Sequence, residues 1–360
     1  MQPVSSPVVR LVRAAFGAMA LASLGGLLTP WLSRALVARG DALAWLIDLA
    51  AHWQWLFLVV MAIAIVPMVA VGGRGWAVLL LAAPLPWLSA SPLLEPARAA
   101  PEATLSIASA NVFYRNHDPA RLRAWLDQIR PDIVVVVEIS HRFARALEGA
   151  AWEDYPHRHI SPSSDAFGVA VLSRHPLEAA TVWRDPDGVG VLLARVAWRD
   201  RTFSLAAFHP VPPQSVHHHL ERNLMLDCLT PEPAAAGVGP GAGAAIVAGD
   251  FNATPWSDAF AGPASRGWRR ATGLQPTWPV SWRGLMGIPI DHVLANDRWR
   301  VREAEVGPDV GSDHWPVVVR LQAEPAAMAA GEATGPRDDD PIAQVTSCLS
   351  RAPANARSGA

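Results

Sequence analysis

Residues 245–252, with the sequence AIVAGDFN, combine a short apolar run with an acid and an amide. Such a run bounded by a glycine is typical of a buried strand. Side chains alternate along an extended backbone, so Asp250 and Asn252 point to the same side. A carboxylate beside an amide suits the binding of a hard cation or the orientation of a water molecule. Asp and Asn are also common turn residues, and for this stretch alone a turn is the better interpretation.

Other apolar runs in the chain end in the same way. Glu138 follows four valines, where strand propensity does not explain a glutamate, and His209 precedes a proline that stops strand pairing. Each residue alone fits a polar turn or a solvated strand end. Convergence of many such groups at strand ends is the pattern of an active site. In chain order, the set is Asn111, Glu138, His209, Asp250, Asn252, Asp291, Asp313 and His314.

The 360 residues carry a formal net charge of −2, which argues against a strongly basic protein that coats nucleic acid. Cys228 and Cys348 are far apart in the sequence. They form no recognisable disulfide framework and no zinc-binding spacing, and they leave the redox compartment open.

Three runs without charge, residues 14–32, 53–73 and 75–94, are long enough to cross a bilayer as helices. We therefore predict three transmembrane helices, the third bent or short because it contains Pro84, Pro86 and Pro92. The first run also fits a signal peptide, with a poor cleavage site. The positive-inside rule gives a tie and does not decide the orientation.

The coarse organisation has four parts. Residues 1–95 are predicted to be the membrane anchor, 96–103 a linker, 104–322 the catalytic domain and 323–360 a disordered tail. In the third part, short apolar strands alternate with helices and turns, which predicts a layered α/β sandwich. The expected strands cover residues 104–111, 132–138, 167–172, 190–196, 202–209, 288–294 and 315–321, besides the run that ends at Asp250.

The ordered motifs resemble those of the endonuclease/exonuclease/phosphatase (DNase I-like) superfamily, over residues 104–322. That group includes DNase I-like nucleases, apurinic endonucleases, sphingomyelinases and inositol-polyphosphate phosphatases. The motifs are Asn111, PDIVVVVE at 131–138, GDFN at 249–252, IDHV at 290–293 and SDHWPV at 312–317. GVAVLSR at 168–174 is similar to the characteristic central strand, and FHP at 208–210 to the histidine segment of two branches.

The resemblance implies a four-layer α/β sandwich, two packed β-sheets flanked by helices, and a divalent-metal-dependent phosphoester hydrolase. Glu138 would bind the cation, Mg2+ or else Mn2+, with help from Asn111 and Asp313. The metal would neutralise a phosphate oxygen and stabilise the leaving alkoxide.

The same resemblance implies the catalytic roles. Asp250 would orient or deprotonate the attacking water, with Asn252 fixing the phosphate or water beside it. His314, oriented by Asp291, would contact the phosphate, and His209 would act on the leaving-group side. The reaction would be in-line hydrolysis without a covalent enzyme intermediate.

Three spans ahead of such a domain resemble bacterial inner-membrane members, which implies a multi-pass protein whose catalytic domain faces the extracytoplasmic side. The expected partners are the lipid bilayer and a phosphoester substrate, either nucleic acid or phospholipid, with no obligate protein partner evident. A phosphomonoesterase and a catalytically silent, membrane-tethered binding domain on the same fold are the alternatives. Five tryptophans serve either a substrate groove or the core: Trp152, Trp256, Trp278, Trp282 and Trp315.

Overall fold

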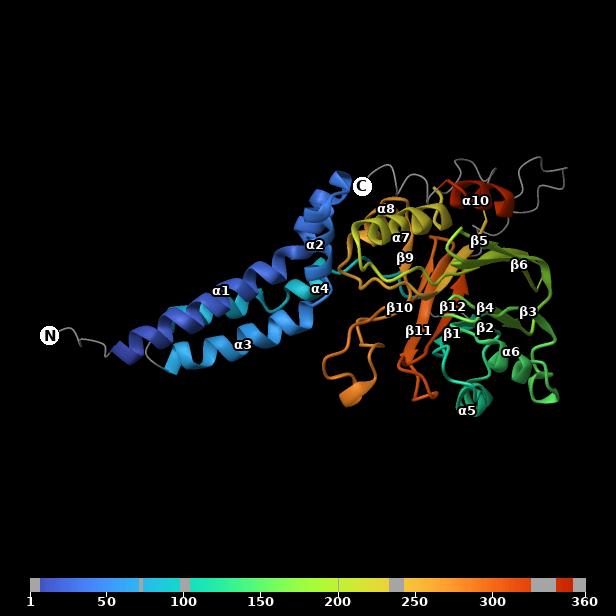
Figure 1. Cartoon of the computed structure of the whole chain (residues 1–360), viewed down its shortest axis with the longest axis horizontal. Helices are drawn as coiled ribbons and strands as arrows, with labels where there is room; N and C mark the ends of the chain where they lie inside the picture. Colours follow the sequence, from blue (N-terminus) through green and yellow to red (C-terminus); the bar gives the residue numbers. More distant parts are fainter. Residues whose placement is uncertain are drawn as a thin grey trace. The chain divides into compact units, whose positions relative to one another are not determined.

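The computed structural model describes residues 7–70, 74–97, 104–199, 201–232, 243–324 and 341–351. The chain forms two compact units. The first contains the residues up to Ala90 together with the segment Pro255–Asp258, and the second contains Ser91–Thr254 and the chain from Ala259 onward (Figure 1).

The first unit is helical. Asp41 caps one of its helices as the sequence predicts, because its carboxylate accepts the N–H groups of Leu43 and Ala44. Gly26 allows two helices to approach closely, since a Cβ at this position would lie 2.4 Å from the ring of Phe57. The elements are α1 (Pro7–Leu36), η1 (Val37–Arg39), α2 (Ala42–Ala51), α3 (Gln54–Ala70), η2 (Arg74–Ala82) and α4 (Leu85–Ser89).

The prediction of three transmembrane helices is wrong. Among the described residues, one helix, Pro7–Arg39, is long and apolar enough to cross a membrane. A second span results only if α2 and α3, which meet at a bend of 67°, are taken together. The third run is broken by prolines into η2 and the five-residue α4, because proline lacks the amide hydrogen that a continuous helix needs.

The second unit contains two six-stranded mixed sheets. The first has the order β11-β12-β1-β2-β4-β3 and the second the order β5-β6-β7-β8-β10-β9. Among the described strands, β1 pairs with β2 and β7 with β8 in parallel, and the other neighbouring strands of the two sheets are antiparallel. The first sheet consists of β1 (Thr104–Asn111), β2 (Ile133–Val137), β3 (His157–Ser161), β4 (Val169–Ser173), β11 (Trp299–Val306) and β12 (Val317–Ala323). The second consists of β5 (Leu177–Arg184), β6 (Gly190–Trp198), β7 (Arg201–Ala207), β8 (Ala245–Asp250), β9 (Arg269–Arg270) and β10 (Asp291–Ala295).

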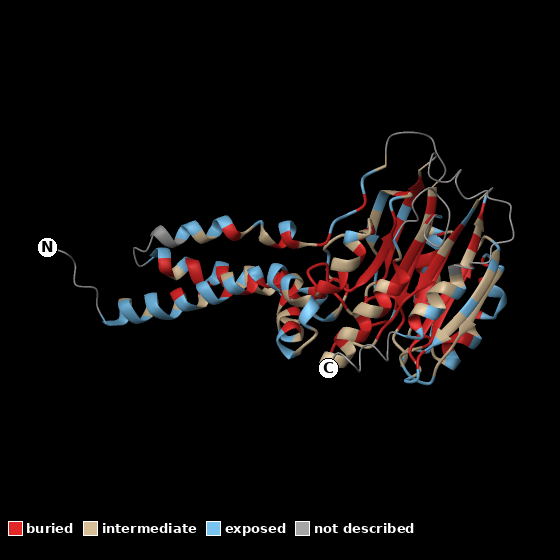
Figure 2. Ribbon diagram, turned by 90° about the horizontal axis from the view of Figure 1, so that it is seen from above, coloured by how far each residue is buried: buried red, intermediate tan, exposed pale blue. Residues whose placement is uncertain are grey.

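Alternation along the strands divides their side chains between two cores. Ile107 and Val135 of the first sheet point inward to a core shared with Leu205 and Ile246 of the second. Their neighbours point outward and are covered by helices. Figure 2 shows that burial is concentrated in these strands. The expected sandwich of two packed sheets flanked by helices is therefore confirmed.

Helices cover both outer faces of the sandwich. The first sheet packs against α5 (Ala120–Ile129) and α6 (His141–Leu147), and the second against α7 (Val216–Leu229) and α10 (Pro341–Leu349). Short helical turns complete the unit: η3 (Ala150–Trp152), η5 (Asp258–Phe260), α8 (Ala261–Ser265) and η6 (Ser281–Gly284).

The segment that leaves the helices is paired rather than free. Leu94 N–H donates to the carbonyl of Arg270 in β9, and Ala97 N–H donates to the carbonyl of Val301 in β11, both at 2.8 Å. Residues 91–97 therefore run along one edge strand of each sheet. The predicted linker, 96–103, begins within this paired segment, and residues 98–103 lie outside the described residues.

The tail and the cysteines differ from expectation. Residues 341–349 form α10, although the sequence predicted disorder from residue 323, and β12 extends to Ala323. A disulfide between Cys228 of α7 and Cys348 of α10 holds this helix against the domain. Spacing along the chain could not indicate a cross-link between residues separated by 120 positions. Residues 325–340 and 352–360 lie outside the described residues.

Candidate active site

Polar residues at the ends of the central strands meet at one rim of the sandwich. β1 ends at Asn111, β2 ends directly before Glu138, and β8 ends at Asp250. Because β10 runs antiparallel to β8, it begins at this rim, with Asp291 directly opposite Asp250. A hydrogen bond of 3.1 Å from Asn111 Nδ2 to Asp250 Oδ2 joins the two sheets here.

Asn111 contacts three other rim residues. Its Nδ2 lies 2.8 Å from Glu138 Oε1 and 3.1 Å from Asp250 Oδ2. His314 Nε2 is 3.3 Å away from the same atom. The amide has two hydrogens, and both go to the carboxylates. Oδ1 accepts the backbone N–H of Phe113 at 2.9 Å, so a local turn fixes which side of the amide faces the acids.

Glu138 is held in an unusual backbone conformation. Its φ of 60° lies in the left-handed region, which few residues other than glycine adopt. Oε2 accepts the backbone N–H of Tyr114 at 3.1 Å, so both carboxylate oxygens are oriented. The side chain is 12% exposed. Strain of this kind is concentrated at functional sites, where the surrounding structure imposes it.

Asp250 lies between two imidazoles. Its Oδ2 is 3.5 Å from His209 Nε2 and 3.6 Å from His314 Nε2. Burial raises the pKa of Asp250 to about 6, with the charge of His314 opposing this rise and that of Asp291 adding to it. The carboxylate therefore sits in an environment that raises its basicity, as a general base requires.

His314 and Asp291 form a buried pair. Nδ1 of His314 lies 2.9 Å from Oδ2 of Asp291, and both side chains are almost fully buried. Burial lowers the pKa of His314, but the charges of Asp291 and Asp250 outweigh it and raise the pKa to about 10. The imidazole is therefore a cation at neutral pH, and its Nε2–H is available beside Asp250.

His209 completes the rim from the strand end after β7. Its Nε2 lies 3.7 Å from Glu138 Oε1, in addition to the contact with Asp250. Nδ1 lies 3.1 Å from the carbonyl of Ala166, which can only accept a hydrogen bond. Nδ1 therefore carries a proton, and Nε2 carries a second one only in the cationic form.

The side chains of two predicted site residues, Asn252 and Asp313, make their hydrogen bonds to residues outside the predicted set. The side chain of Asn252 donates through Nδ2 to the carbonyl of Pro210 at 2.9 Å, while its backbone N–H donates to Asp250 Oδ1 at 2.9 Å. Asp313 Oδ2 accepts the indole N–H of Trp278 at 3.2 Å. Its Oδ1 is buried and accepts no hydrogen bond from the described residues.

The candidate tryptophans divide between core and rim. Trp152 and Trp256 are 1% and 0% exposed and belong to the interior, so a groove role for them is wrong. Trp278 and Trp315 are half-buried, and the ring of Trp278 lies 6.3 Å from that of the rim histidine at 314. The side chain of Trp282 lies outside the described residues.

The donor set fits a divalent cation. Glu138, His209 and Asp250 each offer an atom within 4.8 Å of the others. Carboxylate oxygens dominate, as hard cations prefer. The buried Oδ1 of Asp313 accepts no hydrogen bond from the described residues, and burial raises the pKa of Asp250. A bound cation would stabilise the ionised form of both carboxylates.

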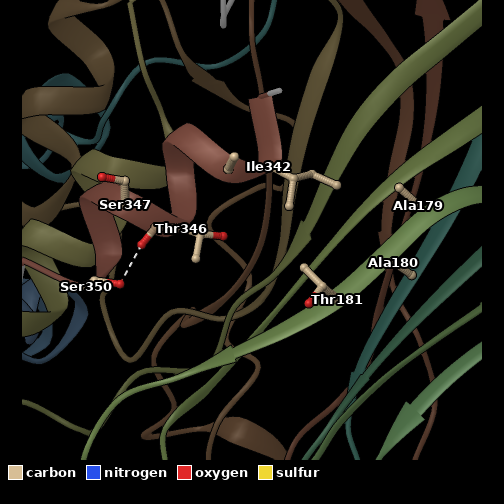
Figure 3. Close-up of a pocket in the computed structure, with 8 residues that line it drawn as sticks. Ala179, Ala180, Thr181, Ile342, Thr346, Ser347 and Ser350 are labelled. Atoms are coloured by element: carbon tan, nitrogen blue, oxygen red, sulfur yellow. Dashed lines mark hydrogen bonds between the residues drawn. The ribbon is translucent and has the colours of Figure 1, made fainter. Parts of the chain in front are cut away.

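A separate hollow of about 540 Å³ lies between β5 and α10. Figure 3 shows that small side chains line it, and that Ser350 donates back to the carbonyl of Thr346, at 2.8 Å. No acid, imidazole or other ionisable group lines it among the described residues. The rim, rather than this hollow, is therefore the candidate active site.

Two packed sheets with acids, amides and imidazoles at one rim define an α/β sandwich with a candidate metal-dependent hydrolytic site. The chain belongs to the endonuclease/exonuclease/phosphatase family, whose model matches residues 108–314. Members of this family are typically metal-dependent phosphoester hydrolases. No curated protein matches the chain.

Solved structures resemble the second unit. Humanized TDP2 from D. rerio with 14 mutations has 17% identity and a TM-score of 0.50, over 61% of this chain and 99% of that chain, which shows the fold. D. rerio TDP2 complexed with a single strand DNA product has 17% identity and a TM-score of 0.49, over 62% and 100%. An endonuclease/exonuclease/phosphatase from Beutenbergia cavernae DSM 12333 has 21% identity and a TM-score of 0.48, over 61% and 72%.

Proposed function

We propose that this protein is a membrane-tethered, divalent-metal-dependent phosphodiesterase that hydrolyses its substrate by in-line attack of water. The observation that carries the proposal is the position of Asp250, which lies between His209 and His314 and is bonded to Asn111 beside Glu138. This arrangement brings a base, two imidazoles and an acidic cation site together, with 3.5–3.7 Å between the imidazole nitrogens and the carboxylate oxygens.

Glu138 and Asp313 are the proposed metal ligands, for Mg2+ in preference to Mn2+. The bound cation would neutralise a phosphate oxygen and the leaving alkoxide. Asn111 was predicted to be a third ligand. In the arrangement observed, its amide nitrogen faces Glu138 and holds that carboxylate in position, at 2.8 Å.

Asp250 is the proposed base for the attacking water. Burial raises its pKa to about 6, so it is ionised at neutral pH yet more basic than an exposed aspartate. The backbone N–H of Asn252 fixes the other carboxylate oxygen and leaves Oδ2 facing the site. The Asn252 side chain is the proposed contact for the phosphate or water, and it would have to leave Pro210 to make that contact.

His314 is the proposed phosphate contact. Asp291 keeps it protonated, so Nε2 can donate to the negative charge that builds up on phosphorus oxygens. His209 is proposed to act on the leaving-group side, because its Nε2 borders both Glu138 and Asp250.

An exposed apolar tip beside the rim favours a substrate with an apolar part. Leu285 and Met286 are 82% and 44% exposed, in a loop whose flanking residues Trp278 and Ile288 pair with each other. Val280 N–H donates to the Asp313 carbonyl and fastens this loop to the site. A phospholipid diester fits such a tip, and a nucleic acid remains the second candidate because it carries the same phosphodiester.

Membrane tethering is supported by the surface of the first unit. Apart from Leu93, Leu285 and Met286, the exposed large hydrophobic residues of the described chain all belong to this unit. Such a surface is typical of lipid contact. The disulfide favours an oxidising compartment. We therefore propose that the helical unit contacts a membrane and that the catalytic domain lies on its oxidising, extracytoplasmic side.

The test is hydrolysis by the full-length chain in detergent micelles, with Mg2+ or with chelator. The substrates are sphingomyelin, phosphatidylinositol phosphates, single-stranded DNA, duplex DNA and bis-p-nitrophenyl phosphate. We expect metal-dependent turnover that Asp250→Ala and His314→Ala abolish, whereas Asp309→Ala, an exposed acid paired with Arg121, leaves it intact. A folded protein that turns over none of these substrates would instead be a silent binding domain.

A further inference from the structure

The helical unit contains a segment that comes shortly after β8, the strand that ends at Asp250. Pro255–Asp258 belongs to the same compact unit as the residues up to Ala90. It begins three residues after Asn252 and five after Asp250. The backbone between them is short, so a shift of the segment is transmitted to the end of β8 through few rotatable bonds.

Trp256 anchors this segment among the helices. Its side chain is 0% exposed, and its indole Nε1–H donates to the carbonyl of Pro86 at 2.7 Å. Its ring meets that of Trp55 edge to face, with centroids 5.3 Å apart. Burial of a large aromatic side chain with its polar atom hydrogen-bonded favours a single position of this segment.

Asp48 of α2 binds the same segment through its carboxylate. Oδ1 accepts the backbone N–H of Asp258 at 2.8 Å, and Oδ2 accepts the hydroxyl of Ser257 at 3.1 Å. Ser33 of α1 lies 3.1 Å both from Asp48 Oδ1 and from Asp258 Oδ2. Two helices of the unit thus bind one four-residue segment.

A buried carboxylate in α2 needs an explanation, because the helix is otherwise apolar, with the sequence ALAWLIDLAA. Asp48 is 0% exposed, and burial of an acid is costly unless hydrogen bonds compensate it. An apolar residue here would serve helix packing at lower cost. Ser33 and His52, whose Nε2 lies 3.6 Å away, also face this carboxylate. The hydrogen bonds from Ser257 and Asp258 give the acid a further use, which is to hold the segment in register.

The residues between β8 and this segment begin with Asn252, which contacts the proposed base, Asp250. Asn252 N–H donates to Asp250 Oδ1 at 2.9 Å, and Asn252 has a φ of 48°, an unusual value that its surroundings must maintain. Arg222 fixes the carbonyl of Asn252 at 3.0 Å, and His292 fixes that of Ala253, also at 3.0 Å. Residues 252 and 253 are thus held by hydrogen bonds to their carbonyls, and the segment 255–258 is held by its bonds to the helices.

We infer that the helical unit positions the catalytic base, with Asp48 and Trp256 as positioning residues that hold the chain after Asp250. The helices then support catalysis as well as tethering the protein. This inference rests on the proposed function for its effect on turnover. Its structural part, that Asp48 orders residues 251–258, stands independently.

The test compares Asp48→Ala with Asp41→Ala in the full-length chain. Asp41→Ala removes the N-cap of the same helix without touching the segment. Two experiments are made on each variant. One measures amide hydrogen exchange of the peptide covering residues 251–258, and the other measures kcat and KM on bis-p-nitrophenyl phosphate. Trp256→Phe, which keeps an aromatic ring at this position and loses the bond to Pro86, is the second variant if Asp48→Ala does not fold.

For Asp48→Ala we expect faster exchange in this peptide and a kcat roughly ten- to a hundredfold lower with little change in KM, because misplacement of a base weakens the reacting geometry rather than binding. Asp48→Asn, which keeps an oxygen acceptor, should recover part of both, and Asp41→Ala should change neither. Unchanged exchange or an unchanged kcat in Asp48→Ala overturns the inference. If the wild-type chain shows no turnover, the proposed function fails, and exchange alone decides whether Asp48 orders the segment.

Discussion

Asp291 Oδ2 lies 2.9 Å from Nδ1 of His314, while Asp250, directly opposite Asp291 across β8 and β10, approaches Nε2 of the same ring from the other side at 3.6 Å. One imidazole is thus held between two buried carboxylates from neighbouring strands. The pair explains how a histidine stays cationic in the interior, and it links the acid that starts β10 to the acid that ends β8.

Replacement of Asp291 by Asn should remove the charge that keeps His314 protonated. We expect the pKa of His314 to fall from about 10, and kcat to fall roughly a hundredfold, the size of a general-acid or charge-stabilising contribution. NMR titration of the imidazole and steady-state kinetics measure the two effects. An exposed acid, Asp309, changed to Asn is the matched control. Full activity in Asp291→Asn would show that His314 does not need Asp291 as its partner.

Gly249 is required by the backbone around it. A Cβ at this position would lie 2.0 Å from the carbonyl oxygen of Phe208, and its φ is 146°. Gly249→Ala should therefore cost more than about 3 kcal/mol, since strain and a backbone clash combine. Gly188 also has a positive φ but an open surrounding. Gly188→Ala should cost only about 1–2 kcal/mol. Chemical denaturation compares them, and equal losses would contradict this account.

His292 should make the protein sensitive to acid. Burial first, and then the charge of Arg270, lower its pKa to about 3. The unfolded chain, with a pKa of about 6.5, takes up the proton more readily, so this contribution to stability is complete above about pH 6.5 and is lost as the pH falls toward 3, by up to about 1.4 kcal/mol per pH unit.

The measurement is the free energy of unfolding between pH 7 and 4 for wild type and for His292→Gln, whose amide can still bond Thr272 and the Ala253 carbonyl. The variant should be less stable at pH 7 and lose stability less steeply on acidification. Parallel pH profiles would refute the role of His292.

Reduction of the Cys228–Cys348 disulfide should destabilise the protein. The cross-link closes a long loop, and loss of such a bond typically costs about 2–4 kcal/mol. Dithiothreitol should lower the Tm of the wild type and release α10 to proteases. Cys348→Ser should have the lower Tm already and show no further response to the reductant. If reduction leaves the wild-type Tm unchanged, the disulfide contributes nothing to the stability of the unit.

The strands that carry the site were predictable from sequence, because their residues are buried on both faces and read as apolar runs. β2, with four valines before Glu138, is the clearest example. The strands that were missed lie at or next to sheet edges and expose one face. β3 has the sequence HRHIS and contains no buried residue, so its sequence has no apolar pattern that would predict a strand. Its pairing with β4 decides its conformation.

The helical unit was harder to predict. Hydropathy identified the apolar runs but not the points at which the helices end. A transmembrane helix was predicted where Pro84 and Pro86 interrupt the helix. The contribution of Asp48 was invisible because its partners are about 210 residues away in the sequence. The disulfide was missed for the same reason, since long-range contacts leave no local pattern.

At the site, residue types were predictable and their orientations were not. The resemblance implied that Asn111 helps to bind the metal, which stays a prediction, while the structure turns its amide nitrogen toward Glu138 and its oxygen toward the N–H of Phe113. Only the turn after β1 decides this orientation. Arg222, which fixes the carbonyl of Asn252, was not singled out.

The most direct test of the central claim is the rate of bis-p-nitrophenyl phosphate hydrolysis by the full-length chain as Mg2+ is titrated, with Glu138→Gln as the variant and the exposed Glu148→Gln as its control. We predict turnover that saturates with metal, vanishes with chelator, and is lost in Glu138→Gln but kept in Glu148→Gln. The metal should also raise the Tm of the wild type and not that of Glu138→Gln, since a ligand that binds the folded state stabilises it by about 2.7 kcal/mol at a hundred times its Kd. Turnover that is independent of metal, or that survives intact in Glu138→Gln, would contradict a cation held at this rim.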